Sequence, residues 1–450
     1  MLQQARTRYL LISLLYVGVL SWIYLTEMIF QWSYMGLVGA LSFEGVVGIL
    51  FLSTVIAVFT PNKRDVRSYV IATLNFIFFY PSIVFLCFAP GEVVHFLMLF
   101  LVFGLLVVVS NTEITAPQIA EASPSTIMLP ALGLTIFAVV LQAAFGGLTY
   151  FNLDIERVYD FRRVAARELP GIFDYLYSNV STAVMPVALL LALKFRNWLV
   201  VGLVLFCTVL LFGMTQHKSV LFAPWAVVAL YYFYGRTPQA YVIGYLFMGV
   251  LGLCTLELIR IDIAGTPEAG YLTSLVVRRV LLIPAVLDSY YIEFFSINEF
   301  YYWSSSRLGF FSSGNDYIVS APFVIGETYF SDPDMSANAG LIGSGFSNAG
   351  IIGVAAYGLA AGLILSMLQS YGKRIGHAFV SAVSILTVFN IITSTDILTS
   401  LLTHGLLMLI ILLSFFNGDG TLKSAARIAS KRKTATPKAG SANSREPQPA

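Results

Sequence analysis

Arginines rather than lysines populate two stretches of this 450-residue chain, 148–173 and the region from residue 260 to residue 341. A guanidinium group binds phosphate or carboxylate through two parallel hydrogen bonds, whereas the lysine ammonium acts as a point charge. Any single arginine could pair with a neighbouring acid. An anionic ligand explains the preference for arginine over lysine in both stretches more simply. The arginines are Arg157, Arg162, Arg163, Arg167, Arg260, Arg278, Arg279 and Arg307.

An aromatic and acidic run follows Arg278 and Arg279. Its carboxylates could exchange protons with a reacting group. Its aromatic rings could form a platform for sugar rings or a belt at the membrane interface, and the sequence leaves both roles open. The run contains Asp288, Tyr290, Tyr291, Glu293, Phe294, Phe295, Glu299, Tyr301, Tyr302 and Trp303.

A glycine-rich segment begins at Ser336. From Gly350 onward, its small residues predict close packing of helices. It is not a dinucleotide-binding loop, because the third glycine and a preceding strand are missing. The amides of Asn338 and Asn348 lie at the mouth of this helix, where they must find partners and could bind hydroxyl or phosphate groups.

Ionisable residues inside apolar segments are functional candidates. Glu257 and Arg260 are one helical turn apart, which predicts an ion pair. Asp396 is expected at a helix start. Only Glu44 and His404 are expected deep inside the membrane, and two such residues are too few for an ion pathway. No cluster of Asp or His suggests a metal site, and the three cysteines fall inside apolar runs as buried hydrophobic residues.

The composition excludes a soluble globular protein. Hydrophobic residues make up 58% of the chain and charged residues only 11%, against roughly 25% charged residues in soluble domains. Apolar runs of about 20 residues predict an all-α, polytopic integral membrane protein. The twelve expected transmembrane segments are 9–30, 36–60, 68–89, 92–110, 126–147, 174–193, 197–214, 218–235, 240–260, 341–368, 377–394 and 397–416.

The segments define a membrane domain, 1–420, and a basic tail, 421–450, that we expect to be disordered and to contact anionic lipids. Most lysines and arginines fall in loops on one side, which predicts cytoplasmic N- and C-termini. The two arginine-rich loops, about 148–173 and 261–341, then lie on the opposite side of the membrane from the cytoplasm. The larger loop joins the ninth and tenth helices. Near Pro284 it is too charged to span and too apolar for water, so an interfacial or re-entrant helix is expected.

Three stretches resemble bacterial Wzy-type polymerases of O-antigen and capsular repeat units. They are SANAGLIGSGFSNAGIIGVAAYGLAAGLIL from Ser336, RRVLLIPAVLDSYYIEFFS from Arg278, and GMTQHKSVLF from Gly213. The resemblance implies a glycosyltransferase of the bacterial inner membrane. It would transfer a growing glycan from undecaprenyl pyrophosphate to a lipid-linked repeat unit on the periplasmic face.

The resemblance also implies roles for particular residues and partners. Arg278 and Arg279, supported by Arg157, Arg162, Arg163 and Arg307, would bind the pyrophosphate and stabilise its departure. Glu293 is the first candidate for the base that takes the acceptor proton, followed by Asp288 and Glu327. Tyr291, Trp303, Asn338 and Asn348 would bind substrate. We expect neither a metal nor a cofactor; the partners would be the undecaprenyl-pyrophosphate-linked oligosaccharide, membrane lipids and a chain-length regulator, and no nucleic acid.

Two other functions compete with this one. An O-antigen ligase shares the topology and the arginine chemistry, but it usually relies on a histidine in the outer loop, and 261–341 contains none. A flippase or transporter of lipid-linked oligosaccharides would show paired charges inside the membrane and internal repeats, and neither is evident. The long asymmetric loop favours an enzyme.

Overall fold

The computed structural model describes residues 2–89, 93–154, 172–236, 241–265, 269–304 and 317–417. Within these ranges the chain is helical, and its β-structure is limited to one isolated bridge between Ala122 and Phe416. The protein is therefore an all-α polytopic membrane protein, as the composition predicted.

Each of the twelve predicted segments falls on a helix or a helix pair. They are α1 (Leu2–Ile23), α3 (Phe43–Phe59), α4 (Val66–Leu74) with α5 (Tyr80–Phe88), α6 (Val93–Val109), α7 (Pro124–Ala144), α9 (Ile172–Asn179) with α10 (Met185–Lys194), α11 (Trp198–Thr215), α12 (Lys218–Arg236), α13 (Tyr241–Ala264), α17 (Leu341–Ile375), α18 (His377–Thr393), and α19 (Ile397–Thr403) with α20 (Leu406–Ser414). Shorter elements are α2 (Ile29–Gln31), α14 (Tyr271–Thr273), α15 (Ile283–Ile297), α16 (Ala321–Phe330) and the π-helical turns η1 (Tyr24–Met28), η3 (Asn75–Phe79), η5 (Val180–Val184) and η6 (Ser274–Leu282).

Fewer helices than the twelve predicted have the length and apolar composition of a membrane span in the described ranges. Eight helices of the described ranges are long and apolar enough to cross a membrane, and α19 with α20 forms a ninth that is bent by 56°. Three further apolar helices have 10–17 residues. A membrane-embedded protein follows from these helices, whereas the predicted count of twelve spans is not confirmed.

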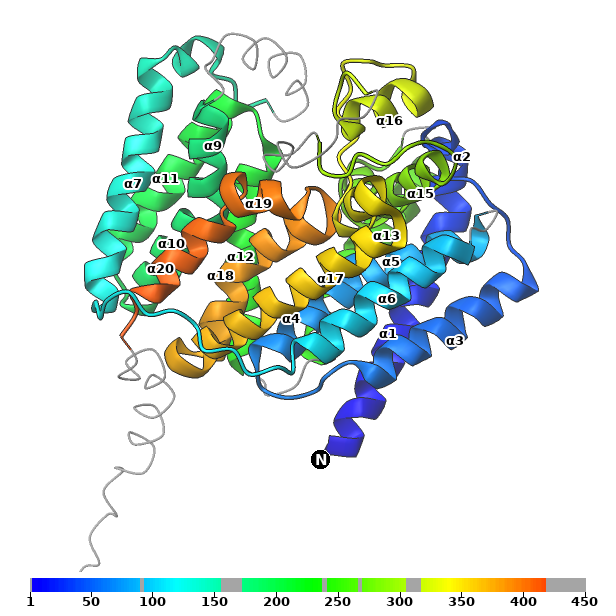
Figure 1. The fold of residues 1–450 in the computed structure, drawn as a ribbon, viewed down its shortest axis with the longest axis horizontal. Helices are drawn as coiled ribbons and strands as arrows, with labels where there is room; N and C mark the ends of the chain where they lie inside the picture. The colour runs from blue at the N-terminus through cyan, green and yellow to red at the C-terminus, as the bar shows by residue number, and fades with distance from the viewer. Residues whose placement is uncertain are drawn as a thin grey trace, which may run out of the picture.

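The elements α14, η6 and α15 form one continuous helix, Tyr271–Ile297. It is long and apolar enough to cross a membrane. However, its first turn bonds to Glu257, only seven residues before the end of α13, and α15 packs against α16 and the beginning of α17. Figure 1 shows α2, α15 and α16 together on the side opposite the N-terminus. The sequence predicted an interfacial or re-entrant helix near Pro284 because the segment carries charge, whereas this helix is by length and composition one of the eight that could cross a membrane.

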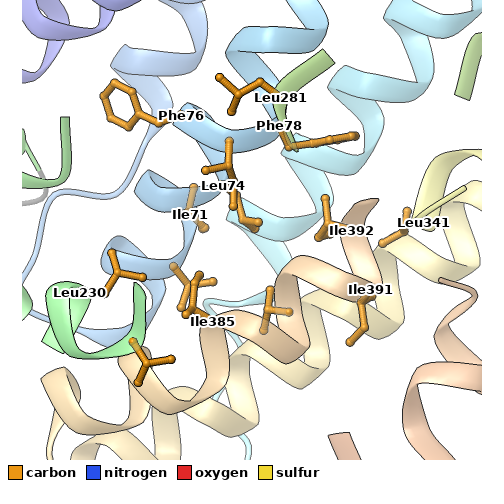
Figure 2. Close-up of a cluster of buried hydrophobic side chains, with 14 of the residues drawn as sticks. Ile71, Leu74, Phe76, Phe78, Leu230, Leu281, Leu341, Ile385, Ile391 and Ile392 are labelled. Carbon is orange, nitrogen blue, oxygen red and sulfur yellow. The ribbon is translucent and has the colours of Figure 1, made fainter. Parts of the chain in front are cut away.

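Helix α17 lies in the middle of the molecule and packs against α4, α6, α15 and α18 (Figure 1). Side chains from six elements meet beside it in a buried apolar core, shown in Figure 2. The labelled residues of this core are Ile71, Leu74, Phe76, Phe78, Leu230, Leu281, Leu341, Ile385, Ile391 and Ile392. The core packs α17 and η6 together and so fixes their positions.

The predicted close packing of the glycine-rich helix is present. A Cβ atom on Gly358 would lie 2.8 Å from Leu105 Cδ1, and one on Gly362 would lie 2.7 Å from Val109 Cβ. Both contacts are with α6. Helices in lipid associate largely through such close van der Waals contact, because lipid chains remove most of the hydrophobic driving force.

We expect Gly362→Ala to lower the free energy of unfolding by about 1–3 kcal/mol, the usual cost of overpacking a tight contact. Gly104→Ala in α6 is the matched control, because a Cβ there would meet no atom within 4 Å. Thermal unfolding of both purified variants in detergent measures the difference. Equal melting temperatures would contradict the role of Gly362 in packing.

Candidate functional site

A cavity of about 260 Å³ opens between α15, α16, α19 and the beginning of α17. We call it the polar cavity. Its lining consists mainly of hydroxyl, amide and carboxylate groups with two tyrosine rings, an unusual set in so apolar a chain. The lining residues are Tyr291, Tyr301, Ser320, Ala321, Pro322, Ser336, Asn338, Ala339, Ser344, Ser347, Asn348, Thr395, Asp396 and Thr399.

A break in α17 forms one wall of the polar cavity. The backbone leaves helical geometry at Ala349 and at Gly350, which has φ +58°. Residues 341–348 thereby form a short helix that folds against the rest of α17. A Cβ on Gly353 would lie 2.0 Å from the carbonyl oxygen of Gly345, so the two backbones touch and only glycine fits at Gly353.

Asp288 anchors this short helix from α15. Its side chain is 1% exposed, and Oδ1 accepts a hydrogen bond of 2.9 Å from the backbone N–H of Gly343. The first N–H groups of a helix have no partner within the helix, so a carboxylate there satisfies a donor and faces the positive end of the helix dipole. Oδ2 of Asp288 has no hydrogen-bond partner in the described part of the chain.

A hydrogen-bond network fixes Asp396 at the opposite wall. The Tyr357 hydroxyl donates to Asp396 Oδ2, while Asp396 Oδ1 accepts from the backbone N–H of Leu398 at 2.8 Å. Trp303 Nε1 donates to the Tyr357 hydroxyl at 2.9 Å, and the Trp303 backbone N–H donates to Asn348 Oδ1 at 2.9 Å. Asp396 is thus a helix cap, as the sequence indicated, and also a wall of the cavity.

Two buried tyrosines complete the walls. The Tyr291 hydroxyl donates to the Ala337 carbonyl at 3.0 Å, and the Tyr301 hydroxyl donates to the Val319 carbonyl at 2.7 Å. Burial raises the pKa of Tyr301 above its ordinary value, which keeps this hydroxyl protonated and donating. Both rings are therefore held in place before any ligand arrives.

The arginine pair lies away from the polar cavity. Arg278 Nε and Nη2 donate to Ser274 Oγ at 3.0 and 2.7 Å, and the guanidinium carbon lies 5.2 Å from the centre of the Trp32 ring. Arg278 precedes Tyr291 by 13 residues, which is roughly 20 Å of helix at about 1.5 Å per residue. The exposed Arg279 is adjacent.

The sequence-predicted residues therefore divide into groups. Tyr291, Asn338 and Asn348 meet at the polar cavity, and Trp303 is bonded to Asn348 beside it. Arg278 and Arg279 form a separate group. Glu293 and Glu327 are exposed and do not line the cavity. Arg157, Arg162, Arg163 and Arg307 lie outside the described residues.

Glu257 does not form the expected ion pair with Arg260. Its carboxylate instead accepts hydrogen bonds from the backbone N–H groups of Leu272 and Thr273 at 2.8 and 2.7 Å, and from the Thr273 hydroxyl. The unpaired N–H groups at the start of the helix Tyr271–Ile297 compete better for a carboxylate than an exposed guanidinium, which water already solvates.

Sequence reasoning missed Tyr357 and the place of Asp396 in the cavity. Asp396 is the only acidic residue between 335 and 417, and Tyr357 interrupts a run of glycine and alanine. These two features of the sequence could have indicated that the residues belong to the site. Among the described residues, no group of three or more His, Cys, Asp or Glu could hold a metal ion.

No protein-family model, curated protein or solved structure matches this chain. The function is therefore proposed from the chemistry of the polar cavity and the arginine pair.

Proposed function

We propose that this protein is a polysaccharide polymerase of the Wzy type. It transfers a growing glycan from undecaprenyl pyrophosphate to a lipid-linked repeat unit. It resides in the bacterial inner membrane with both termini in the cytoplasm, and the arginine pair and the polar cavity face the periplasm. No metal or cofactor is assigned to the reaction.

The observation that carries this proposal is the environment of Arg278. The side chain is half-buried in an apolar helix, and no carboxylate lies within ion-pair distance in the described part of the chain. A partly buried cation without a counter-ion is costly inside a membrane protein, and such residues commonly mark substrate sites. Ser274, Met35 and Trp32 orient the guanidinium and leave some of its N–H groups for an anion such as pyrophosphate.

An apolar groove supports a lipid substrate. Helices α1 and α13 line a groove of about 840 Å³ that contains apolar side chains, three glycines and one threonine. The same two helices contact the arginine pair. Trp32, which follows α1 and its extension, lies against Arg278, and Glu257 of α13 caps the helix that carries Arg278. A polyprenyl chain in this groove would place its pyrophosphate toward the arginines.

The separation of charges matches a long substrate. Arg279 precedes Glu293 by 14 residues, roughly 20 Å of helix, so the two cannot flank the same bond. The arginine pair instead holds the anionic head group, and the sugars extend along α15 on the same side of the bundle. In the transfer, an acceptor hydroxyl attacks the anomeric carbon, the bond to pyrophosphate breaks with its electron pair leaving on pyrophosphate, and the hydroxyl proton passes to a base close to the arginine pair rather than to Glu293.

The test is the surface and lipid-linked glycan profile of a deletion strain beside its complemented parent. We expect the deletion to remove the long-chain ladder while single repeat units still reach their final acceptor. Long chains on the lipid carrier would indicate a ligase instead. Repeat units trapped on the cytoplasmic face would indicate a flippase, and an unchanged profile would end the glycan assignment.

A further inference from the structure

The polar cavity contains acceptors and neutral donors but no cationic side chain among its lining residues. A phosphate group would find a carboxylate there and nothing to balance its charge. At about 260 Å³ the cavity is slightly smaller than pockets for drug-sized ligands, which occupy roughly 300–1,000 Å³. Its size and chemistry suit one neutral ring that carries several hydroxyl groups.

We propose that the polar cavity is a carbohydrate subsite, which binds one sugar ring of the lipid-linked substrate through hydrogen bonds with Asp396 and Asn338. This inference rests on the proposed function and adds a second binding site to it. The arginine pair holds the charged end of the substrate, and the polar cavity holds a sugar several rings away.

Asp396 has the orientation and the remaining capacity for this role. An ionised carboxylate offers about four acceptor positions. The backbone N–H groups of Leu398 and Thr399 and the Tyr357 hydroxyl occupy three of them. A sugar hydroxyl can donate to the fourth, and a hydrogen bond to a charged acceptor is among the stronger ones.

Asn338 supplies the complementary donor at the mouth of the cavity. Its side chain is exposed, and its Oδ1 accepts from the Ser336 hydroxyl at 3.1 Å. Its Nδ2 group donates to no described residue and is available to a ligand. A hydroxyl group both donates and accepts, so a sugar ring can donate to the carboxylate and accept from the amide N–H, both of which line the cavity.

The walls are organised before binding. Tyr291, Tyr301 and Asn348 are already bonded to backbone groups of neighbouring segments, and Asp288 fixes the short helix that carries Ser344 and Ser347. A preorganised site loses less conformational entropy when its ligand binds.

The spacing gives the subsite a selectivity. Because roughly 20 Å of helix separates Arg278 from Tyr291, a single sugar attached to the pyrophosphate cannot reach both sites. A repeat unit of several sugars can. The two sites together favour complete lipid-linked units over unfinished ones.

Binding of two lipids to the purified full-length protein tests this inference. The probes are undecaprenyl pyrophosphate without sugar and the lipid-linked repeat unit extracted from the deletion strain. For Asp396→Asn and for Asn338→Leu, we expect about tenfold or greater loss of affinity for the sugar-bearing lipid. Affinity for the bare lipid should stay within about twofold of the parent. Arg279→Ala should weaken both.

The matched control is Asp65→Asn. Asp65 also caps a helix, accepting from the Ser68 backbone N–H at 2.8 Å, but it lies at the start of α4 on the opposite side of the bundle (Figure 1). It should bind both lipids as the parent does. Asn338→Leu changes an exposed side chain, so it decides the question even if Asp396→Asn does not yield folded protein.

The outcomes separate the two proposals. Parent-like affinity of both cavity variants for the sugar-bearing lipid overturns the subsite and leaves the polymerase standing. Equal losses for both lipids also overturn it, since they would show a structural effect. A parent protein that binds neither lipid removes the proposed function itself.

Discussion

Gly353→Ala is expected to yield little folded protein. The added Cβ would lie 2.0 Å from the Gly345 carbonyl oxygen, and a backbone carbonyl cannot swing aside as a side-chain end can. Relief would require the short helix 341–348 to move away, which breaks the bond from Gly343 to Asp288. We expect a cost above the usual 1–3 kcal/mol of overpacking, a large part of a total stability of about 5–15 kcal/mol.

Yield after detergent extraction and the midpoint of thermal unfolding measure this effect. Gly202→Ala in α11 is the matched control, because a Cβ there meets no atom within 4 Å. It should express and melt like the parent. If Gly353→Ala melts within about 2 °C of the parent, the contact between the two halves of α17 does not hold the fold.

Arg279→Ala and Arg278→Ala are expected to remove most long-chain polymer from a complemented deletion strain. Loss of a preorganised group that stabilises an anion typically costs about a hundredfold or more in rate. Arg278→Lys should retain only part of the activity, since lysine keeps the charge but loses the planar fork and the stacking on Trp32. The length and yield of the polymer are the readouts.

Arg8→Ala is the control for the arginine variants. The Arg8 guanidinium also lies over an aromatic ring, that of Tyr241 at 5.8 Å, but near the N-terminus at the other end of α1. It should leave the polymer unchanged. Wild-type polymer from Arg279→Ala would refute the pyrophosphate assignment.

The sequence predicted the class of fold well because apolar runs of membrane length leave few alternatives. It did not predict that the segment around Arg278 and Pro284 forms one continuous helix long and apolar enough to cross a membrane, because the charges and the proline suggested an interruption. The break in α17 was not predictable, because a run of glycine and alanine has the same appearance in a straight helix and in a broken one. Without that break, nothing indicates that Asn348 and Tyr357 approach Asp396.

The prediction that the arginines and the carboxylates form one site was wrong for a different reason. The sequence places Arg279 and Glu293 in one short run, which suggests one site. Once that run is helical, the rise of each residue sets them roughly 20 Å apart. Glu257 shows a related limit: a carboxylate close to an arginine in the sequence was bound by the backbone of a later helix.

The order of the two proposed sites along the chain has a consequence for biosynthesis. The residues of the arginine pair and of the apolar groove all precede residue 297, whereas the cavity wall of Thr395, Asp396 and Thr399 is translated later. If the two sites bind as proposed, a chain that stops before Thr395 would contain the residues of the lipid site and lack those of the sugar site. Such a fragment would be expected to bind the carrier lipid without the contacts to the sugar.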